Sequence, residues 1–149
     1  MFDPLTAIPR AVGRATTLLA STTPAAGAVS TNGNAVRIPE WMHGVAFTLD
    51  LTAAATEVGD TLDVTVQTLI DGTNWLDICH FTQLLGNGGA KRYTGKCYGA
   101  AAEAMFEHGS ALAAGSVRHL LGDAYRVKYV QVDANSNAAF TFSVSAMPL

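Results

Sequence analysis

Apolar and polar residues alternate at period two along much of this chain, the pattern of strands with one buried face. The alternation is clearest at residues 62–69, where Leu62, Val64, Val66 and Thr68 share one face. The intervening side chains are mostly polar and fall on the other face. This segment is predicted to be a half-buried antiparallel strand.

Further short runs rich in β-branched and aromatic residues, bounded by Gly, Asn, Asp, Ser or Pro, also predict strands. They span residues 15–21, 35–39, 44–51, 75–81, 124–132 and 140–146. In the last two runs, one face of the strand at residues 124–132 carries Tyr125, Val127, Tyr129 and Gln131, and the core stripe of the strand at residues 140–146 is Phe140, Phe142 and Val144. We expect this core stripe to share one sandwich core with Leu62, Val64 and Val66.

A hairpin is predicted between residues 62–69 and 75–81. The connecting sequence is Asp71-Gly72-Thr73-Asn74, and Asp-Gly is a strong hairpin signal because glycine accepts positive φ without steric cost. Simple alternation through the second strand groups its side chains into two sets. One is Trp75, Asp77, Cys79 and Phe81; the other is Leu76, Ile78 and His80.

The alternation weakens between residues 86 and 121. The stretch Gly86-Asn87-Gly88-Gly89-Ala90-Lys91-Arg92 predicts a flexible loop with a basic end. It matches a phosphate-binding loop poorly, because such a loop has Ser or Thr after its lysine and then opens a helix, so the flexible loop is the better account. The alanine-rich residues 100–108 are compatible with a short helix or with an extended arm, and the pattern leaves both open.

These segments predict an all-β protein with an antiparallel, jelly-roll-like β-sandwich and one long alanine-rich excursion. The 149 residues match the size of a single domain. We place that domain at residues 15–149 and an extended N-terminal arm at residues 1–14, where Pro4 and Pro9 limit both helix and sheet.

Composition restricts the partners of this domain. Charged residues make up 14% of the chain, against roughly 25% in ordinary soluble domains, so we expect part of the surface to be covered by other chains. A net charge of −3 argues against direct nucleic-acid binding. The absence of a long apolar run and of a basic start followed by an apolar stretch predicts no membrane contact and synthesis in a cytoplasm.

The residues that could carry chemistry form no recognisable catalytic motif, and we expect no enzyme activity, cofactor or metal. His43, His80, His108 and His119 lack metal-ligand spacing. Cys79 and Cys97 are expected to be buried, reduced thiols, and Asp71 a turn residue that caps backbone amides rather than a partner of Asp77 in acid–base chemistry. Trp41, Trp75, Tyr93 and Tyr98 could form a sugar-stacking platform, but a tryptophan directly after a tight turn, such as Trp75, more often packs over the end of the sheet than binds a ligand.

Two parts of the sequence resemble a known group of proteins. They are TLDVTVQTLIDGTNWLDICHF with the following TQLLGNGGAKRY, and GDAYRVKYVQVD with AFTFSVSA. They resemble small β-sandwich proteins encoded among the head and neck genes of tailed bacteriophages. The resemblance implies a virion protein, foremost a capsid decoration (cement) protein, with no catalytic residues to carry over.

The implied partners are the major capsid protein or other virion proteins, with assembly in the cytoplasm of a bacterial host. We expect a homo-oligomer, a trimer at local three-fold positions, because sheet edges and apolar surface need cover. The alternatives are a ring protein of the neck or tail and a carbohydrate-binding jelly roll on the particle surface.

Attachment is expected through the N-terminal arm and the basic loop. The expected contact residues are Phe2, Leu5, Ile8, Val12, Lys91 and Arg92. The apolar side chains of the arm have no polar face of their own and need a neighbouring chain to receive them. The alternative is that the arm folds back on its own sandwich.

Overall fold

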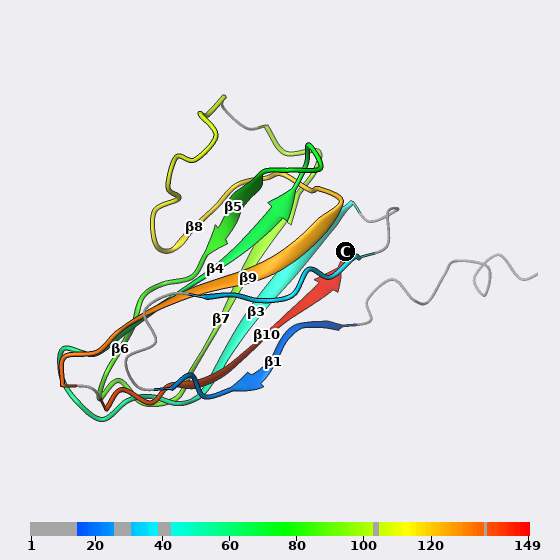
Figure 1. Cartoon of the computed structure of the whole chain (residues 1–149). Helices are drawn as coiled ribbons and strands as arrows, with labels where there is room; N and C mark the ends of the chain where they lie inside the picture. Colours follow the sequence, from blue (N-terminus) through cyan, green and yellow to red (C-terminus); the bar gives the residue numbers. More distant parts are fainter. Residues whose placement is uncertain (1–14, 26–30, 39–42, 103–104, 136) are drawn as a thin grey trace, which may run out of the picture.

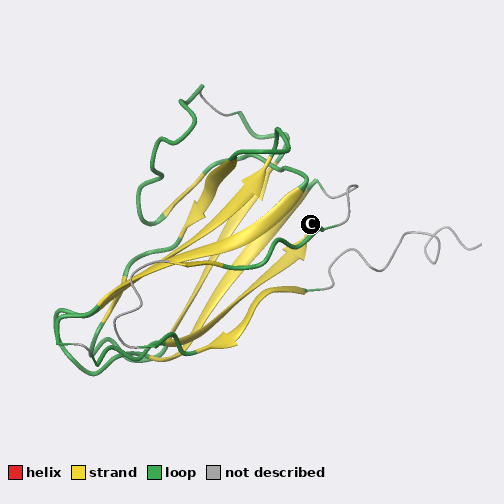
Figure 2. Ribbon diagram, viewed as in Figure 1, coloured by secondary structure: helices red, strands yellow, loops and turns green. Residues whose placement is uncertain are grey.

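The protein consists of two antiparallel sheets packed face to face. The computed structural model describes residues 15–25, 31–38, 43–102, 105–135 and 137–149, and within these ranges it contains strands and loops but no helix (Figures 1 and 2). The all-β, antiparallel sandwich is therefore confirmed, while the jelly-roll connectivity stays a prediction. No described helix is long and apolar enough to cross a membrane.

The smaller sheet has four strands in the order β1-β10-β3-β7, which we call the four-stranded sheet. Its strands are β1 (Thr16–Thr22), β10 (Thr141–Pro148), β3 (Gly44–Ala53) and β7 (Lys91–Tyr98). The larger one, the six-stranded sheet, has the order β2-β9-β4-β5-β8, with β6 also paired to β4. Its strands are β2 (Thr31–Asn32), β9 (Ala124–Val132), β4 (Thr61–Leu69), β5 (Trp75–His80), β8 (Ser116–Val117) and β6 (Leu84–Leu85).

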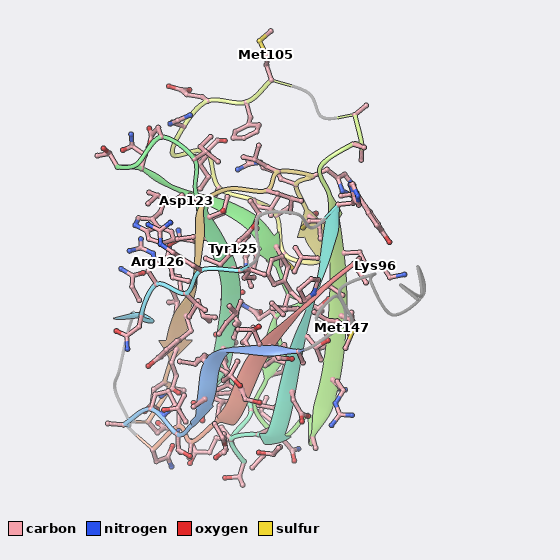
Figure 3. All side chains as sticks on the ribbon, turned by 90° about the vertical axis from the view of Figure 1, so that its right-hand side faces the viewer. Lys96, Met105, Asp123, Tyr125, Arg126 and Met147 are labelled. Atoms are coloured by element: carbon pink, nitrogen blue, oxygen red, sulfur yellow. The ribbon has the colours of Figure 1, made fainter. Side chains whose placement is uncertain are left out.

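The core lies between the sheets and contains the side chains that alternation selects. All of the following are buried, as predicted: Leu62, Val64, Val66, Phe140, Phe142 and Val144. Tyr125 stands between the two sheets, whereas Arg126 and Lys96 point outward on opposite sides (Figure 3). The centre of the Tyr125 ring lies 5.8 Å from the centre of the Phe47 ring, and the Tyr129 ring meets the Phe142 ring edge-on with centres 5.3 Å apart. Both distances are favourable for aromatic pairs.

The predicted β4–β5 hairpin is confirmed. Gly72 has φ of 78°, and Asp71 Oδ1 accepts hydrogen bonds from the backbone N–H groups of Thr73 (2.9 Å) and Asn74 (2.6 Å). These bonds lower the pKa of Asp71 to about 2, the bonds from Asn74 having the larger effect. Asp71 is thus a turn residue, as expected.

One shift in strand pairing changes the predicted faces of β5. Val66 pairs with Cys79, but the next residue, Gln67, pairs with Asp77, so Ile78 is an extra residue in β5. Such a bulge moves the side chains beyond it to the other face. Ile78 and Cys79 are consequently both buried, and His80 lies on the outer face. The grouping of His80 with Leu76 and Ile78 was wrong for this reason.

The weakly patterned region also differs from the prediction. Lys91 and Arg92 do not end a loop but begin β7. The sequence did not predict this strand because Gly95 stands at an inner position where alternation would place an apolar side chain. A Cβ at this position would lie 2.7 Å from Cys79 Sγ, so there is no space for a larger residue. The described part of residues 100–108 is irregular. Of the piece at residues 35–39, Val36 makes an isolated bridge to Tyr125.

The N-terminal arm, with Phe2, Leu5, Ile8 and Val12, lies outside the described residues, as does Trp41. The attachment role of the arm therefore stays a prediction.

The two thiols are buried inside the sandwich and form no disulfide. Cys79 comes from β5 and Cys97 from β7, so they belong to different sheets. Cys97 Sγ donates to the Ile78 carbonyl oxygen at 3.5 Å. Burial raises the pKa of Cys79 to about 12, and the neighbouring Cys97 adds to the effect.

We expect Phe142→Ala to lower the free energy of unfolding by about 3–5 kcal/mol, because it removes a fully buried ring between two sheets. Urea denaturation followed by tryptophan fluorescence measures this loss. Met105→Ala is the matched control, since Met105 is fully exposed and should leave the unfolding free energy nearly unchanged. A Phe142→Ala protein as stable as the parent would contradict the core assignment.

We expect the melting temperature to fall as the pH rises above about 9. Burial raises the pKa of both Cys79 and Tyr125 to about 12, from ordinary values of 9.0 and 10.0. The folded state therefore keeps these protons where the unfolded chain loses them, so alkaline pH favours unfolding. Calorimetry between about pH 8 and pH 11 should show a smaller slope for Cys79→Ala than for the parent; equal slopes would contradict the assignment to Cys79.

Candidate functional site

The outer face of the six-stranded sheet carries the most varied chemistry of the described surface. Its centre is formed by alternate residues of β4 that point away from the core, with neighbours on both sides set by the antiparallel register. From β4 these residues are Thr61, Asp63, Thr65, Gln67 and Leu69. Their neighbours in β9 are Val132, Val130, Lys128, Arg126 and Ala124, and those in β5 are His80, Asp77 and Trp75.

The character of this face changes along the strands. Leu85 and Val132, which flank Thr61, are exposed and make one end apolar. The middle is polar, and Trp75 lies at the other end. The segment after β7 lies beside β5 and β8 at the Trp75 end, away from β6 (Figure 1). It covers part of the polar middle, and we call its residues 109–112 the covering loop.

Arg118 fastens the covering loop. It follows β8, is 8% exposed, and its guanidinium donates to the carbonyl oxygens of Asp77 (3.2 Å) and Ser110 (3.3 Å) and to Ser110 Oγ (3.0 Å). The ring of Phe106 stacks on the same guanidinium at 4.1 Å. A buried guanidinium needs such partners, because an unpaired buried charge is strongly unfavourable.

His80 makes a second connection to the covering loop. Its Nδ1 lies 2.7 Å from the carbonyl oxygen of Leu112, and its Nε2 lies 3.2 Å from Asp63 Oδ1. Both partners are acceptors, whereas a neutral imidazole has one N–H. The two hydrogen bonds therefore exist together only when the ring carries both protons. The other oxygen of Asp63 accepts from Gln83 Nε2 at 2.8 Å.

A chain of contacts orders the Trp75 end of the face. The guanidinium of Arg126 lies 4.3 Å from the centre of the Trp75 ring. Arg126 Nε donates to Gln67 Oε1 at 2.8 Å, and Gln67 Nε2 donates to Asp77 Oδ1 at 2.8 Å. Burial lowers the pKa of Arg126, with the charge of Asp77 opposing that effect. Each of these side chains is held by the next, so their orientations are fixed.

Two adjoining pockets lie between the sheet and the covering loop. One, of about 200 Å³, is lined by Gln67, Trp75, Leu76, Asp77, Gly109, Ser110, Ala111 and Lys128. The other, of about 240 Å³, is lined by Asp63, Thr65, Asp77, His80, Ala111, Leu112, Lys128 and Val130. They share Asp77, Ala111 and Lys128, and we call the pair the sheet-face groove. Within the described residues, the side-chain ammonium of Lys128 has no hydrogen-bond or ion-pair partner.

The outer face of the four-stranded sheet has a different character. It is built mainly from short hydroxyl side chains, and Thr48 Oγ1 lies 3.0 Å from Thr94 Oγ1. Arg92 Nη2 donates to Asp50 Oδ2 at 2.9 Å. This hydrogen bond and the negative charge of Asp50 raise the pKa of Arg92. At the β7 edge, the peptide groups of Arg92, Thr94 and Lys96 point away from β3. No other described strand pairs there.

The structure separates the residues that the sequence nominated. Lys91 and Arg92 lie on the four-stranded sheet, away from the sheet-face groove. Of the described aromatic candidates, Trp75 borders the groove, Tyr93 is half-buried against the core and Tyr98 stacks on His119. The described residues contain no group of His, Cys, Asp or Glu suited to a metal ion.

Sequence analysis did not nominate Gln67 and Lys128, which line the groove, or Arg118, which holds the covering loop beside it. Gln67 and Lys128 had a usable signal, because they are polar outward positions of strongly alternating strands. Arg118 had none, since it lies in the unpatterned excursion and gains its partners only from the fold.

Comparisons with family models, with curated proteins and with solved structures found no match. The function is therefore argued from the geometry.

We expect His80→Ala to loosen the covering loop, because the substitution removes the imidazole that contacts both the Leu112 carbonyl oxygen and Asp63 Oδ1. Hydrogen exchange of residues 109–113 measures the loss of protection relative to the parent. Met105→Ala, at a fully exposed position, is the control and should leave the protection unchanged. Equal protection in His80→Ala and the parent would contradict the role of His80 in holding the loop.

Proposed function

We propose that this chain is a structural protein of a virus particle, and specifically a capsid decoration protein that binds the assembled shell. The observation that carries the proposal is the exposed four-stranded sheet, with its face of short hydroxyl side chains and the open edge of β7. Such a face lets another protein approach closely, and short side chains lose little conformational freedom when covered.

The β7 edge favours contact with a different protein. Lys91, Arg92 and Lys96 are exposed along it, and positive charges on an edge strand oppose its pairing with a second copy of itself. A neutral or acidic strand of another chain meets no such repulsion. A major capsid protein fits that role, and bridging neighbouring capsid subunits would add buried interface to a shell under pressure from packaged DNA.

The sequence resemblance to bacteriophage head and neck proteins supports the same proposal. The supporting segments include β4, the β4–β5 turn, β5 and β9, which are the centre of the six-stranded sheet. The alternative placement, in a ring of the neck or tail, differs in symmetry. Electron microscopy of particles distinguishes them: a decoration protein occupies repeated positions over the shell, and a ring protein one axial position.

We expect purified particles of the source virus to contain this chain as a trimer at local three-fold positions. Native mass measurement of the purified protein and image reconstruction of particles with and without it provide the test. Particles that lack the chain would contradict the proposal as a whole. A monomer both in solution and at isolated positions on the shell would contradict the trimer alone.

We expect deletion of residues 2–13 to abolish particle binding without changing the melting temperature. The deletion removes Phe2, Leu5, Ile8 and Val12, and burying a few such side chains contributes several kcal/mol at about 25 cal/mol per Å². Gradient sedimentation of particles mixed with each variant measures binding. Lys91→Gln with Arg92→Gln tests the basic pair, and Lys128→Gln on the opposite face is the control. A large drop in melting temperature would instead place the arm in its own domain.

A further inference from the structure

We propose that the sheet-face groove is a saccharide-binding site that takes one or two rings of a neutral glycan. The proposal rests on the groove alone and holds whether or not the chain is attached to a capsid.

The groove is larger than a single water molecule or ion requires. The pockets measure about 200 and 240 Å³, while one water molecule occupies about 30 Å³ in the liquid. Together they reach the range of small-molecule sites, roughly 300–1,000 Å³. Because they share Asp77, Ala111 and Lys128, a ligand of two linked rings can occupy both at once.

The unsatisfied polar atoms of the groove match hydroxyl groups. One oxygen of Asp77 is bonded by Gln67, while its other oxygen, Lys128 Nζ and Thr65 Oγ1 make no hydrogen bond to other described residues. They offer a carboxylate acceptor, an ammonium donor and a hydroxyl group. A sugar hydroxyl both donates and accepts, so adjacent hydroxyls can bind Asp77 and Lys128 together.

The charges of the groove argue against other ligand classes. Asp63 and Asp77 line it together with Lys128 and His80, so the lining has no excess of positive charge to hold an anionic ligand such as a phosphate. The lining contains too many polar groups for a purely apolar ligand, because their burial without partners is unfavourable. A neutral molecule with many hydroxyl groups satisfies both conditions.

Trp75 supplies the apolar wall that a sugar ring requires. The indole borders the 200 Å³ pocket, and Arg126 stacks on it at 4.3 Å, which fixes the orientation of the ring. One side of a pyranose exposes C–H groups, and these can pack against the indole while the hydroxyls bind Asp77 and Lys128.

The walls of the groove are held in place before any ligand arrives. Gln67 is bonded by Arg126 and in turn bonds Asp77, and Arg118 and His80 fasten the covering loop. Such preorganisation reduces the ordering cost of binding. Rigid polar groups are also what allow one hydroxyl configuration to be chosen over another.

The test is titration of the full-length protein with methyl glycosides of glucose, galactose, mannose and N-acetylglucosamine and with their disaccharides, followed by NMR of the Trp75 indole N–H and the Lys128 amide. We expect at least one neutral saccharide to shift both signals. Trp75→Ala and Lys128→Gln should each weaken its binding about tenfold, and Trp75→Phe should retain more binding than Trp75→Ala. Thr65→Val provides a third variant if the tryptophan replacement lowers the melting temperature.

Arg92→Gln, on the opposite sheet, is the matched control and should bind like the parent. The proposal is overturned if no member of the panel shifts these signals, if binding is confined to acidic sugars, or if a saccharide binds equally well to the Lys128 and Thr65 variants. Particle binding is measured separately, so failure here leaves the capsid proposal unaffected.

Discussion

The pairing of β4 with β5 is the constraint on which the rest of the structure depends. β4 is the centre of the six-stranded sheet, and its inner side chains contact the opposite sheet. The extra residue at Ile78 lets two successive side chains of β5 enter the core and places His80 outside. Without this shift, His80 would face the core, and the covering loop would lose its bond from the sheet.

The two outer faces of the sandwich have separate chemical characters because they meet different neighbours. The four-stranded sheet has no described segment over it, and small hydroxyl side chains bond to one another there. The six-stranded sheet is partly covered by the long excursion after β7, so longer side chains are held in a network of hydrogen bonds. The proposed attachment face and the proposed saccharide site therefore lie on opposite sides of one core and share no residues.

Most of the fold could be predicted from the sequence, because strands such as β4 and β9 alternate strictly and the Asp71-Gly72 turn has one favoured geometry. β7 could not be predicted in this way, because a glycine, Gly95, interrupts the alternation. The space for a side chain at this position is occupied by Cys79 of the other sheet, a contact that the sequence does not reveal. The groove was only partly predictable. Trp75 was nominated, whereas Arg118 and the position of His80 depend on contacts between segments distant in the chain.

The close approach of Gly95 to Cys79 places buried thiols where they can report on separation of the two sheets. The Sγ of Cys79 lies where the β7 side of one sheet meets β5 of the other, and Cys97 is buried between the same strands. Cys79 lines a pocket of about 90 Å³ beside Gly95, whereas Cys97 is fully buried, so a thiol reagent reaches Cys97 only after this edge separates. The rate of Cys97 modification therefore measures how often the two sheets open, and a protein bound along β7 would slow that rate without touching either cysteine.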